Sequence, residues 1–357
     1  MASPVTIRDV ARRVGVSTAT VSYVLNDSRP VAEKTRRRVL QAVEDLGYRP
    51  SVIARGLKAG ESRIIGYSWR PGPPNQFNPI VEKFILSVAE AAARHGYHAL
   101  TFPYPEPSAE LEVYRGIAYS GRVDGFVLPN TRYDDPRMHL LLEAGFPFVA
   151  FGRSNPDWDF PWVDVDGYDG VAQAMAHLLE LGHRRIACLG WCETEPVGED
   201  RLAAYRHAMA SAGLSVEPEW IARIENDHDQ AYQAARAWVQ APPDQRPTAV
   251  VALSDLMAIG VMNAAADAGL SVGHDLAIAG FDDAPVAALL RPALTSVRQP
   301  IWEVAEHVLA ILVELLHGET RSPHQVLLKP QLIVRDSTAL SATSVAPVPQ
   351  HTVLKDA

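Results

Sequence analysis

Short apolar runs alternate with amphipathic runs along most of this chain, from about residue 62 to residue 340. The apolar runs have the length of single strands: RIIGYS, YHALTF, GFVLP, FPFVAFG, RIACLG, TAVVAL and LAIAGF. Between them lie runs with helical spacing, such as VEKFILSVAEAAARHG and LMAIGVMNAAADAG, and several of these end in Gly, as helices commonly do. Such alternation predicts an α/β core of two doubly wound parallel-sheet subdomains, with ligands bound at the carboxyl ends of the strands.

The charge of the chain changes sign near residue 63. The formal net charge is −9 over 357 residues, yet residues 1–63 contain twelve Lys and Arg against six Asp and Glu. The first segment therefore carries +6, and the remainder carries −15. Because a basic block attracts phosphates and an acidic core is repelled by them, this distribution indicates a nucleic-acid-binding segment attached to a core with another task.

Residues 6–26 have the pattern of two short helices joined by a tight turn. Thr6 with Asp9 resembles a capping box, Gly15 suits the sharp turn, and Ser17 suits the N-cap of the second helix. A third helix is expected at about 32–46. The apolar positions that should face inward are Ile7, Val10, Ala11, Val14, Val21, Val24 and Leu25, followed by Val39, Leu40, Val43 and Leu46. The basic side chains of the third helix that are well placed for phosphates are Lys34, Arg36, Arg37 and Arg38. The pattern predicts an all-α helix-turn-helix headpiece, whose second helix enters the major groove.

The motif VTIRDVARRVGVSTATVSYVLN, followed by VAEKTRRRVLQAVEDLGYRPSVIARGLKAG, resembles the headpiece of the LacI/GalR (lactose-repressor) family of bacterial transcriptional regulators. The chain is similar to this family up to about residue 340. The resemblance implies a sequence-specific transcriptional regulator, most simply a repressor of carbohydrate-utilisation genes. It also implies a homodimer on a near-palindromic double-stranded DNA operator, a small sugar-like effector in the cleft between the subdomains, no cofactor and no enzyme activity.

The resemblance also divides the chain. A headpiece is expected at 1–49, a hinge helix with its linker at 50–61, and an effector-binding core at 62–340. The N-subdomain should take 62–163 and 298–329, and the C-subdomain 164–297 and 330–340. The tail at 341–357 has no periodicity and is expected to be disordered. It also lacks leucine heptads, which favours a dimer over a tetramer.

By the same resemblance, Thr18, Ala19 and Tyr23 occupy the positions that read base edges. Further DNA-binding residues, which contact the backbone or support the reading helix, are expected to be Thr6, Ser17, Thr20, Ser22 and Asn26. In the hinge, Ala54 and Leu57 share one face, and Leu57 is the expected minor-groove wedge. Because an exposed helical Gly56 costs roughly 1 kcal/mol against Ala, we hypothesise that the hinge orders only on the operator.

The effector site is expected on loops that follow strands. The resemblance assigns it Trp69, Phe77, Asn78, Arg153, Arg201, Asn226, Ser254, Asp255 and Asp282. Arg201 should hold hydroxyls or a carboxylate of the ligand, and Asp282 should accept hydrogen bonds from it. Two alternatives stay open, because Asp255 could only cap its helix and Arg153 could be an ion-paired hinge residue. Arginines, carboxylates and aromatic faces together suit a polyhydroxylated ligand.

A sugar is favoured over a purine because the pattern of purine-responsive members is absent. The positions that would carry it hold Glu195, Val197 and Asn226. Whether the effector induces or corepresses stays open.

Two other functional classes remain as alternatives. A solute receptor would share the core fold, but the N-terminus lacks a signal-peptide pattern and carries the headpiece, so a cytoplasmic protein is expected. A sugar-modifying enzyme would need a catalytic constellation, and GxGxxG, GxxxxGK[ST] and GxSxG motifs are absent. Cys188 and Cys192 are too few for a disulfide framework or a zinc site, so no metal is expected. No apolar stretch of transmembrane length occurs in the sequence.

Overall fold

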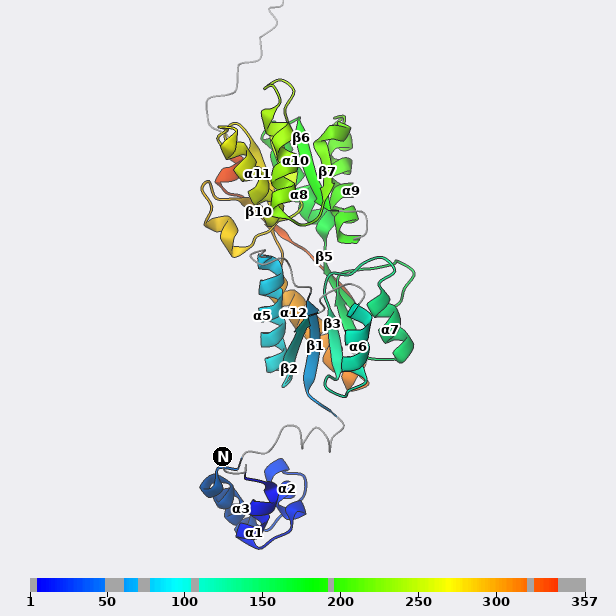
Figure 1. Ribbon diagram of the computed structural model, residues 1–357, viewed down its shortest axis with the longest axis vertical. Helices are drawn as coiled ribbons and strands as arrows, with labels where there is room; N and C mark the ends of the chain where they lie inside the picture. The colour runs from blue at the N-terminus through cyan, green and yellow to red at the C-terminus, as the bar shows by residue number, and fades with distance from the viewer. Residues whose placement is uncertain are drawn as a thin grey trace, which may run out of the picture. The chain divides into compact units, whose positions relative to one another are not determined.

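The computed structural model describes residues 5–48, 61–69, 78–103, 109–191, 196–319 and 324–339. The expectations for the hinge at 50–60, including Ala54 and Leu57, for Phe77 and for the tail at 341–357 lie outside the described residues, as does the side chain of Asn26. The chain separates into two compact units, Met1–Arg63 and Ile64–Ala357 (Figure 1).

The first unit is a three-helix domain built from α1 (Ile7–Val14), α2 (Thr18–Asn26) and α3 (Glu33–Leu46). The expected capping box at the start of α1 is present, and Gly15 ends the helix in the left-handed region with φ 74°. The Ser17 side chain caps α2 by accepting a hydrogen bond from the backbone N–H of Thr20 at 3.0 Å. These local predictions are therefore confirmed.

The core of this unit departs from expectation at one position. Its buried residues are Val10, Ala11, Val14, Val21, Val24, Val39 and Ala42. Leu40, which was expected to face inward, is exposed, and Ala42 lies inside with Val39. Leu40 lies about 100° around the helix from Val39, and this rotation carries it out of the stripe that packs against α1 and α2.

The second unit contains two six-stranded sheets. The first has the order β11-β5-β4-β3-β1-β2, and its neighbouring strands are parallel. Its strands are β1 (Ile64–Trp69), β2 (His98–Pro103), β3 (Gly125–Leu128), β4 (Phe148–Phe151), β5 (Trp162–Val165) and β11 (Gln325–Leu328). Helices α5 (Pro79–Arg94) and α12 (Ile301–Leu316) share one core with one face of the sheet, and α6 (Glu110–Ala118) and α7 (Pro136–Ala144) share another core with the opposite face (Figure 1). We call this sheet with its four helices the N-subdomain.

The second sheet has the order β12-β10-β9-β8-β6-β7. Its strands are β6 (Ile186–Trp191), β7 (Ile221–Ile224), β8 (Ala249–Ala252), β9 (Ala277–Asp282), β10 (Thr295–Arg298) and β12 (Gln331–Ile333). Helices α8 (Gly167–Glu180) and α9 (Pro196–Ser211) pack on one face, and α10 (His228–Gln240) and α11 (Asp255–Asp267) pack on the other. We call this sheet with its four helices the C-subdomain. Short 3₁₀ turns occur at Pro218–Trp220, Pro285–Ala288 and Asp336–Thr338.

The expected α/β class with two parallel-sheet subdomains is confirmed, with two differences of detail. Strand β12 pairs antiparallel with β10, and five short strands were not among the apolar runs of the sequence, namely β5, β7, β10, β11 and β12. The chain passes between the sheets after β5, after β10 and after β11. Within the described residues, no helix is both long enough and apolar enough to cross a membrane.

Candidate functional site

A cavity of about 280 Å³ is lined by residues of both subdomains. Its polar and charged lining residues are Asn78, Asn130, Thr131, Arg132, Asp164, Arg201, Asn226, Asp282 and Gln299. Aromatic and apolar surface comes from Tyr67, Ile80, Val81, Phe84, Pro129, Phe151, Trp191 and Val197. Many of these residues lie at or just after the carboxyl end of a strand, which is where ligands bind in doubly wound sheets.

Arg201 projects from α9 and is almost fully buried. Its Nη1 donates to the carbonyl oxygen of Leu253 at 2.6 Å. The central carbon of its guanidinium group lies 3.5 Å from the ring centroid of Phe281 and 4.6 Å from that of Trp191. Two aromatic rings and a backbone acceptor therefore fix the plane of this guanidinium, which is the preorganisation that a ligand-binding arginine needs.

Asp282 is the last residue of β9 and has a positive φ of 120°. Its Oδ1 accepts a hydrogen bond from Gln299 Nε2 at 2.6 Å. Burial raises the pKa of Asp282 to about 6, against the lowering effect of the nearby Arg201 charge. Above that pH the side chain is a carboxylate, which can accept hydrogen bonds from hydroxyl groups.

Asn226 follows β7 and is oriented by Ser254, as Ser254 Oγ donates to Asn226 Oδ1 at 2.6 Å. The same hydroxyl accepts from the backbone N–H of Met257 at 3.1 Å and so forms the N-cap of α11. The oxygen of Asn226 is thus occupied, and its NH₂ group is left as a donor in a residue that lines the cavity.

In the headpiece, the expected reading positions lie on α2. Thr18 and Ala19 are exposed, and Tyr23 is half-buried with the guanidinium of Arg29 5.2 Å from its ring centroid. Other expected DNA-binding residues take part in local bonds, since Thr6 Oγ1 donates to Asp9 Oδ2 at 2.7 Å. Similarly, the hydroxyls of Ser17 and Thr20 lie 2.9 Å apart, and Ser22 is half-buried.

The basic run of α3 is less free for phosphates than expected. Arg38 Nη2 donates to the carbonyl oxygen of Val14 at 2.7 Å, which ties α3 to the end of α1. Arg36 pairs with Asp27 at 2.6 Å, and Arg37 Nε lies 3.6 Å from Glu33. The last carbonyl groups of a helix have no hydrogen-bond donor within the helix, and Arg38 supplies one to Val14 at the end of α1.

Comparison with known proteins decides the family. Residues 6–51 match the model described as "Bacterial regulatory proteins, lacI family", and residues 175–338 match "Periplasmic binding protein-like domain". The HTH-type transcriptional repressor CytR of Escherichia coli is 31% identical over 340 residues, which is 93% of this chain and 96% of that protein. The chain belongs to the LacI family.

Two solved structures extend the comparison. A LacI-family regulatory protein from Chloroflexus aggregans is 45% identical, with TM-score 0.72, over 77% of this chain and 98% of that one. A complex of the transcriptional regulator CelR with cellobiose is 31% identical, with TM-score 0.72, over 93% of this chain and 99% of that one. The family consists of transcriptional regulators rather than enzymes. This LacI-family chain is a DNA-binding transcriptional regulator with an effector-binding domain.

The structure brings together some of the expected effector residues of this LacI-family core and not others. Asn78, Arg201, Asn226 and Asp282 line the cavity. Among the residues that the structure describes, the cavity lining does not include Trp69, Arg153, Ser254 or Asp255.

Each of these four has another environment. Trp69, at the end of β1, is 38% exposed. Ser254 caps α11, so the alternative that Asp255 is the cap is wrong. Asp255 is buried and accepts hydrogen bonds from Ser296 Oγ at 2.5 Å and from the backbone N–H of Ala284 at 2.7 Å. Burial and the charge of Asp282 raise the pKa of Asp255 well above its ordinary value.

Arg153 is an ion-paired residue between the subdomains, which was the alternative left open for it. Its Nε donates to Asp164 Oδ2 at 2.8 Å, and its Nη2 donates to Asp200 Oδ2. Asp164 belongs to β5, and Asp200 precedes Arg201 on α9. Asp283 is ion-paired within the C-subdomain, with Arg298 and Arg335 at 2.6 Å each.

The loop that follows β3 was not expected to take part in the site. Asn130, Thr131 and Arg132 all line the cavity, and the signal for them was their position directly after the apolar run GFVLP. Gly152, after β4, is required beside them, because a Cβ at its φ of 114° would lie 2.5 Å from Thr131 Oγ1. This close approach packs the loops after β3 and β4 against each other.

Proposed function

We propose that this LacI-family regulator is a homodimeric repressor of carbohydrate-utilisation genes. In this proposal, a neutral sugar-like effector bound in the cavity changes the affinity for a near-palindromic operator. The observation that carries the proposal is the cavity, whose lining combines donors and acceptors, such as Arg201, Asn226 and Asp282, with aromatic and apolar surface, most of it from the N-subdomain. A sugar has hydroxyls for the first and an apolar ring face for the second.

The charges of the cavity support a neutral ligand. Its charged lining residues within the described part of the chain are Arg132 and Arg201 against Asp164 and Asp282, two of each sign. A phosphate or carboxylate ligand would bring a charge that this balanced set does not compensate. The complex of the relative CelR with cellobiose supports the same ligand class.

The DNA-binding part of the proposal concerns residues 1–61. Thr18, Ala19 and Tyr23 would contact base edges, and Thr18 and Ala19 are exposed at the start of α2, as that role requires. The proposed supporting DNA contacts are Thr6, Ser17, Thr20, Ser22 and Asn26, with Ala54 and Leu57 in the hinge. Thr and Ala side chains give few bidentate base contacts, so operator shape would contribute to the choice of site.

The proposed mechanism couples the cavity to the operator. An effector that contacts both subdomains would favour one arrangement of them, and this would alter the relation between the two headpieces of a dimer. Coupling of this kind is typically about 1–3 kcal/mol, and it must be reciprocal between effector and operator. Repression relieved by the sugar is the simplest form.

The test is fluorescence anisotropy of a labelled operator panel with the full chain, at stated salt, with and without glucose, galactose and cellobiose. We expect one sugar to weaken a selective complex. Arg201→Lys should bind the operator as the wild type does but should not respond to the sugar, whereas Arg236→Met, an exposed α10 variant, should respond normally. Failure of the wild type to select any operator would refute the repressor proposal. Tightening by a sugar would replace relief with corepression.

A further inference from the structure

The loop between β3 and α7 brings two polar side chains of the N-subdomain to the cavity. Asn130 and Arg132 both line it, opposite in the fold to Arg201 and Asp282 of the C-subdomain. Neither residue was expected in the effector site.

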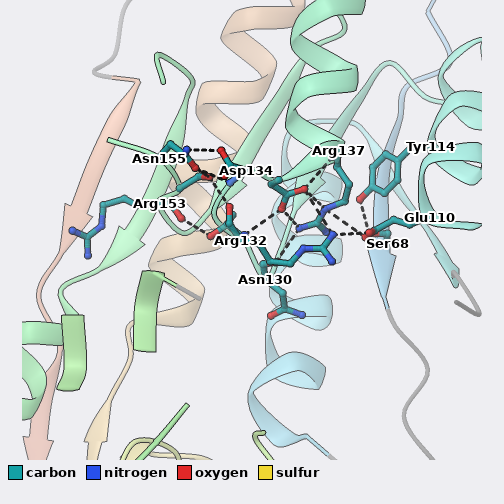
Figure 2. A network of polar contacts seen from close by, with 12 residues as sticks. Ser68, Glu110, Tyr114, Asn130, Arg132, Asp134, Arg137, Arg153 and Asn155 are labelled. Carbon is teal, nitrogen blue, oxygen red and sulfur yellow. Dashed lines mark hydrogen bonds and ion pairs between the residues drawn. The ribbon is translucent and has the colours of Figure 1, made fainter. Parts of the chain in front are cut away.

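A buried ion-pair cluster holds the loop in place, as Figure 2 shows. Arg137 is 1% exposed and donates to Asp135 through Nε at 3.0 Å and through Nη2 at 2.7 Å. Its Nη2 also donates to the carbonyl oxygen of Asn130 at 2.9 Å. Glu110, at the start of α6, lies 3.5 Å from Arg137 Nε and accepts from Arg132 Nη2 at 2.6 Å. The loop is therefore fixed by charge-assisted bonds rather than by exposed turn contacts.

Further bonds fix the backbone on either side of Arg132. Its N–H donates to Asp135 Oδ2 at 3.3 Å, and its carbonyl oxygen accepts from Ser154 Oγ at 2.6 Å. Thr131 Oγ1 donates to the carbonyl oxygen of Arg153 at 2.6 Å. A side chain on this loop thus starts from a fixed backbone, which lowers the entropy that ligand binding would cost.

Only part of the Arg132 guanidinium is used by the cluster. Its Nη2 faces Glu110, with Asp135 Oδ1 4.0 Å away, and the side chain remains 35% exposed. In the described part of the chain, Nε and Nη1 of Arg132 meet no acceptor. Arg137, by contrast, is 2% exposed at its side chain, and its Nε and Nη2 both donate to Asp135. Arg132 therefore keeps donors for a ligand, and Arg137 does not.

Asn130 adds a second set of polar groups. It is exposed, and its φ of 51° is a left-handed conformation that Asn tolerates better than most residues. Its carbonyl oxygen is bound by Arg137, while its side-chain amide has no hydrogen-bond partner within the described residues. In Figure 2 this amide points away from the ion-pair cluster.

We propose that Asn130 and Arg132 form a second polar subsite, which binds hydroxyl oxygens of the effector from the N-subdomain side. Glu110, Asp135 and Arg137 are positioning residues for it. The charge of Arg132 is already compensated by Glu110, so the free guanidinium edge suits neutral oxygen acceptors better than a phosphate. This inference rests on the proposed sugar effector, and it makes the effector a bridge between the two subdomains.

Native mass spectrometry of the full chain tests the subsite. Wild type and variants are incubated with cellobiose, with glucose, and with the low-molecular-mass fraction of a bacterial cell extract. Arg132→Met should bind the captured compound about 10- to 100-fold more weakly, which is the usual effect of losing hydrogen bonds to a charged group. Arg115→Met is the matched control, because Arg115 is an exposed α6 arginine that pairs with Glu112.

Arg132→Lys separates binding from structure. A lysine ammonium can still compensate Glu110, so the melting temperature should match the wild type, but it lacks the second donor edge and should bind as weakly as Arg132→Met. Unchanged binding by Arg132→Met, or full recovery of binding by Arg132→Lys, would overturn the subsite. Loss of a captured non-sugar compound in both variants would support the subsite and refute the sugar class. Capture of nothing by the wild type would refute both proposals.

Discussion

Arg153 offers a test of how the two subdomains are held together. Within the described residues, its contact with Asp200 is the one ion pair that joins the N-subdomain to the C-subdomain. The same guanidinium neutralises Asp164, whose side chain is 6% exposed. Arg153→Met should therefore remove two interactions of different strength.

The larger loss comes from Asp164. Breaking a buried ion pair from one side usually costs about 3–5 kcal/mol, because the remaining charge stays buried without compensation. The Arg153 side chain is 33% exposed, so water screens part of that charge, and we expect about 2 kcal/mol at pH 8. Asp200 is 38% exposed, and Asp200→Asn should cost only about 0–1 kcal/mol.

The dependence on pH distinguishes these contributions. Burial raises the pKa of Asp164 above its ordinary value, and Arg153 opposes that rise through its hydrogen bond and charge. Without Arg153 the pKa of Asp164 rises further, so the folded state binds its proton more tightly than the unfolded state does. The stability of Arg153→Met must then fall as pH rises through that pKa, by at most about 1.4 kcal/mol per pH unit for one proton.

The assay is urea unfolding followed by circular dichroism at pH 5, 6, 7 and 8, for wild type, Arg153→Met and Asp200→Asn. The loss of unfolding free energy in Arg153→Met, relative to wild type, should be smallest at pH 5 and should grow toward pH 8. A deficit that is the same at every pH would show that Asp164 is not the group left uncompensated. An equal deficit in Asp200→Asn would show that the pair between the subdomains, rather than Asp164, carries the stability.

Three single contacts can each be tested by one substitution. Ser17→Ala removes the N-cap of α2 and should speed amide hydrogen exchange in that helix about fivefold, equivalent to about 1 kcal/mol. Gly152→Ala should lower the free energy of unfolding by about 1–3 kcal/mol, because its Cβ would lie 2.5 Å from Thr131 Oγ1 at a positive φ, whereas Gly116→Ala in α6 meets no atom within 4 Å and should not destabilise. Effector affinity, measured by titration calorimetry from pH 5 to 8, should fall below about pH 6 as Asp282 gains a proton, and Asp282→Asn should abolish that dependence.

The features that could be predicted from the sequence are those fixed by neighbouring residues. The capping box at Thr6, the turn at Gly15 and the N-cap at Ser17 each depend on residues a few positions apart. Strands β3, β8 and β9 are buried along their whole length, and they were found because burial on both faces demands continuous apolar runs. Strand β7 is half-buried along its length and lies at an edge of its sheet, so its sequence carries a weaker signal.

The features that escaped prediction depend on residues distant in the sequence. For Arg153 an ion-paired role was left open, but its partner Asp200 could not be identified, because Asp200 is 47 positions away and belongs to the other subdomain. Arg132 lies just after the apolar run GFVLP, but its orientation could not be predicted, because it depends on Glu110, 22 positions earlier. Ion pairs between residues distant in the sequence form only when the chain is folded, so the local sequence pattern cannot predict them.

The weak connection between the subdomains gives a physical reason why a small ligand could control this protein. The chain passes between the sheets three times, and among the described residues one ion pair, which is partly exposed, joins the two subdomains. An exposed pair contributes about 0–1 kcal/mol, which is less than the 1–3 kcal/mol typical of allosteric coupling. An effector that bridges Arg201 and Arg132 would therefore add a connection between the subdomains that is stronger than the Arg153–Asp200 ion pair. If the connection were instead a large apolar interface, the same ligand could bind without changing the arrangement of the subdomains.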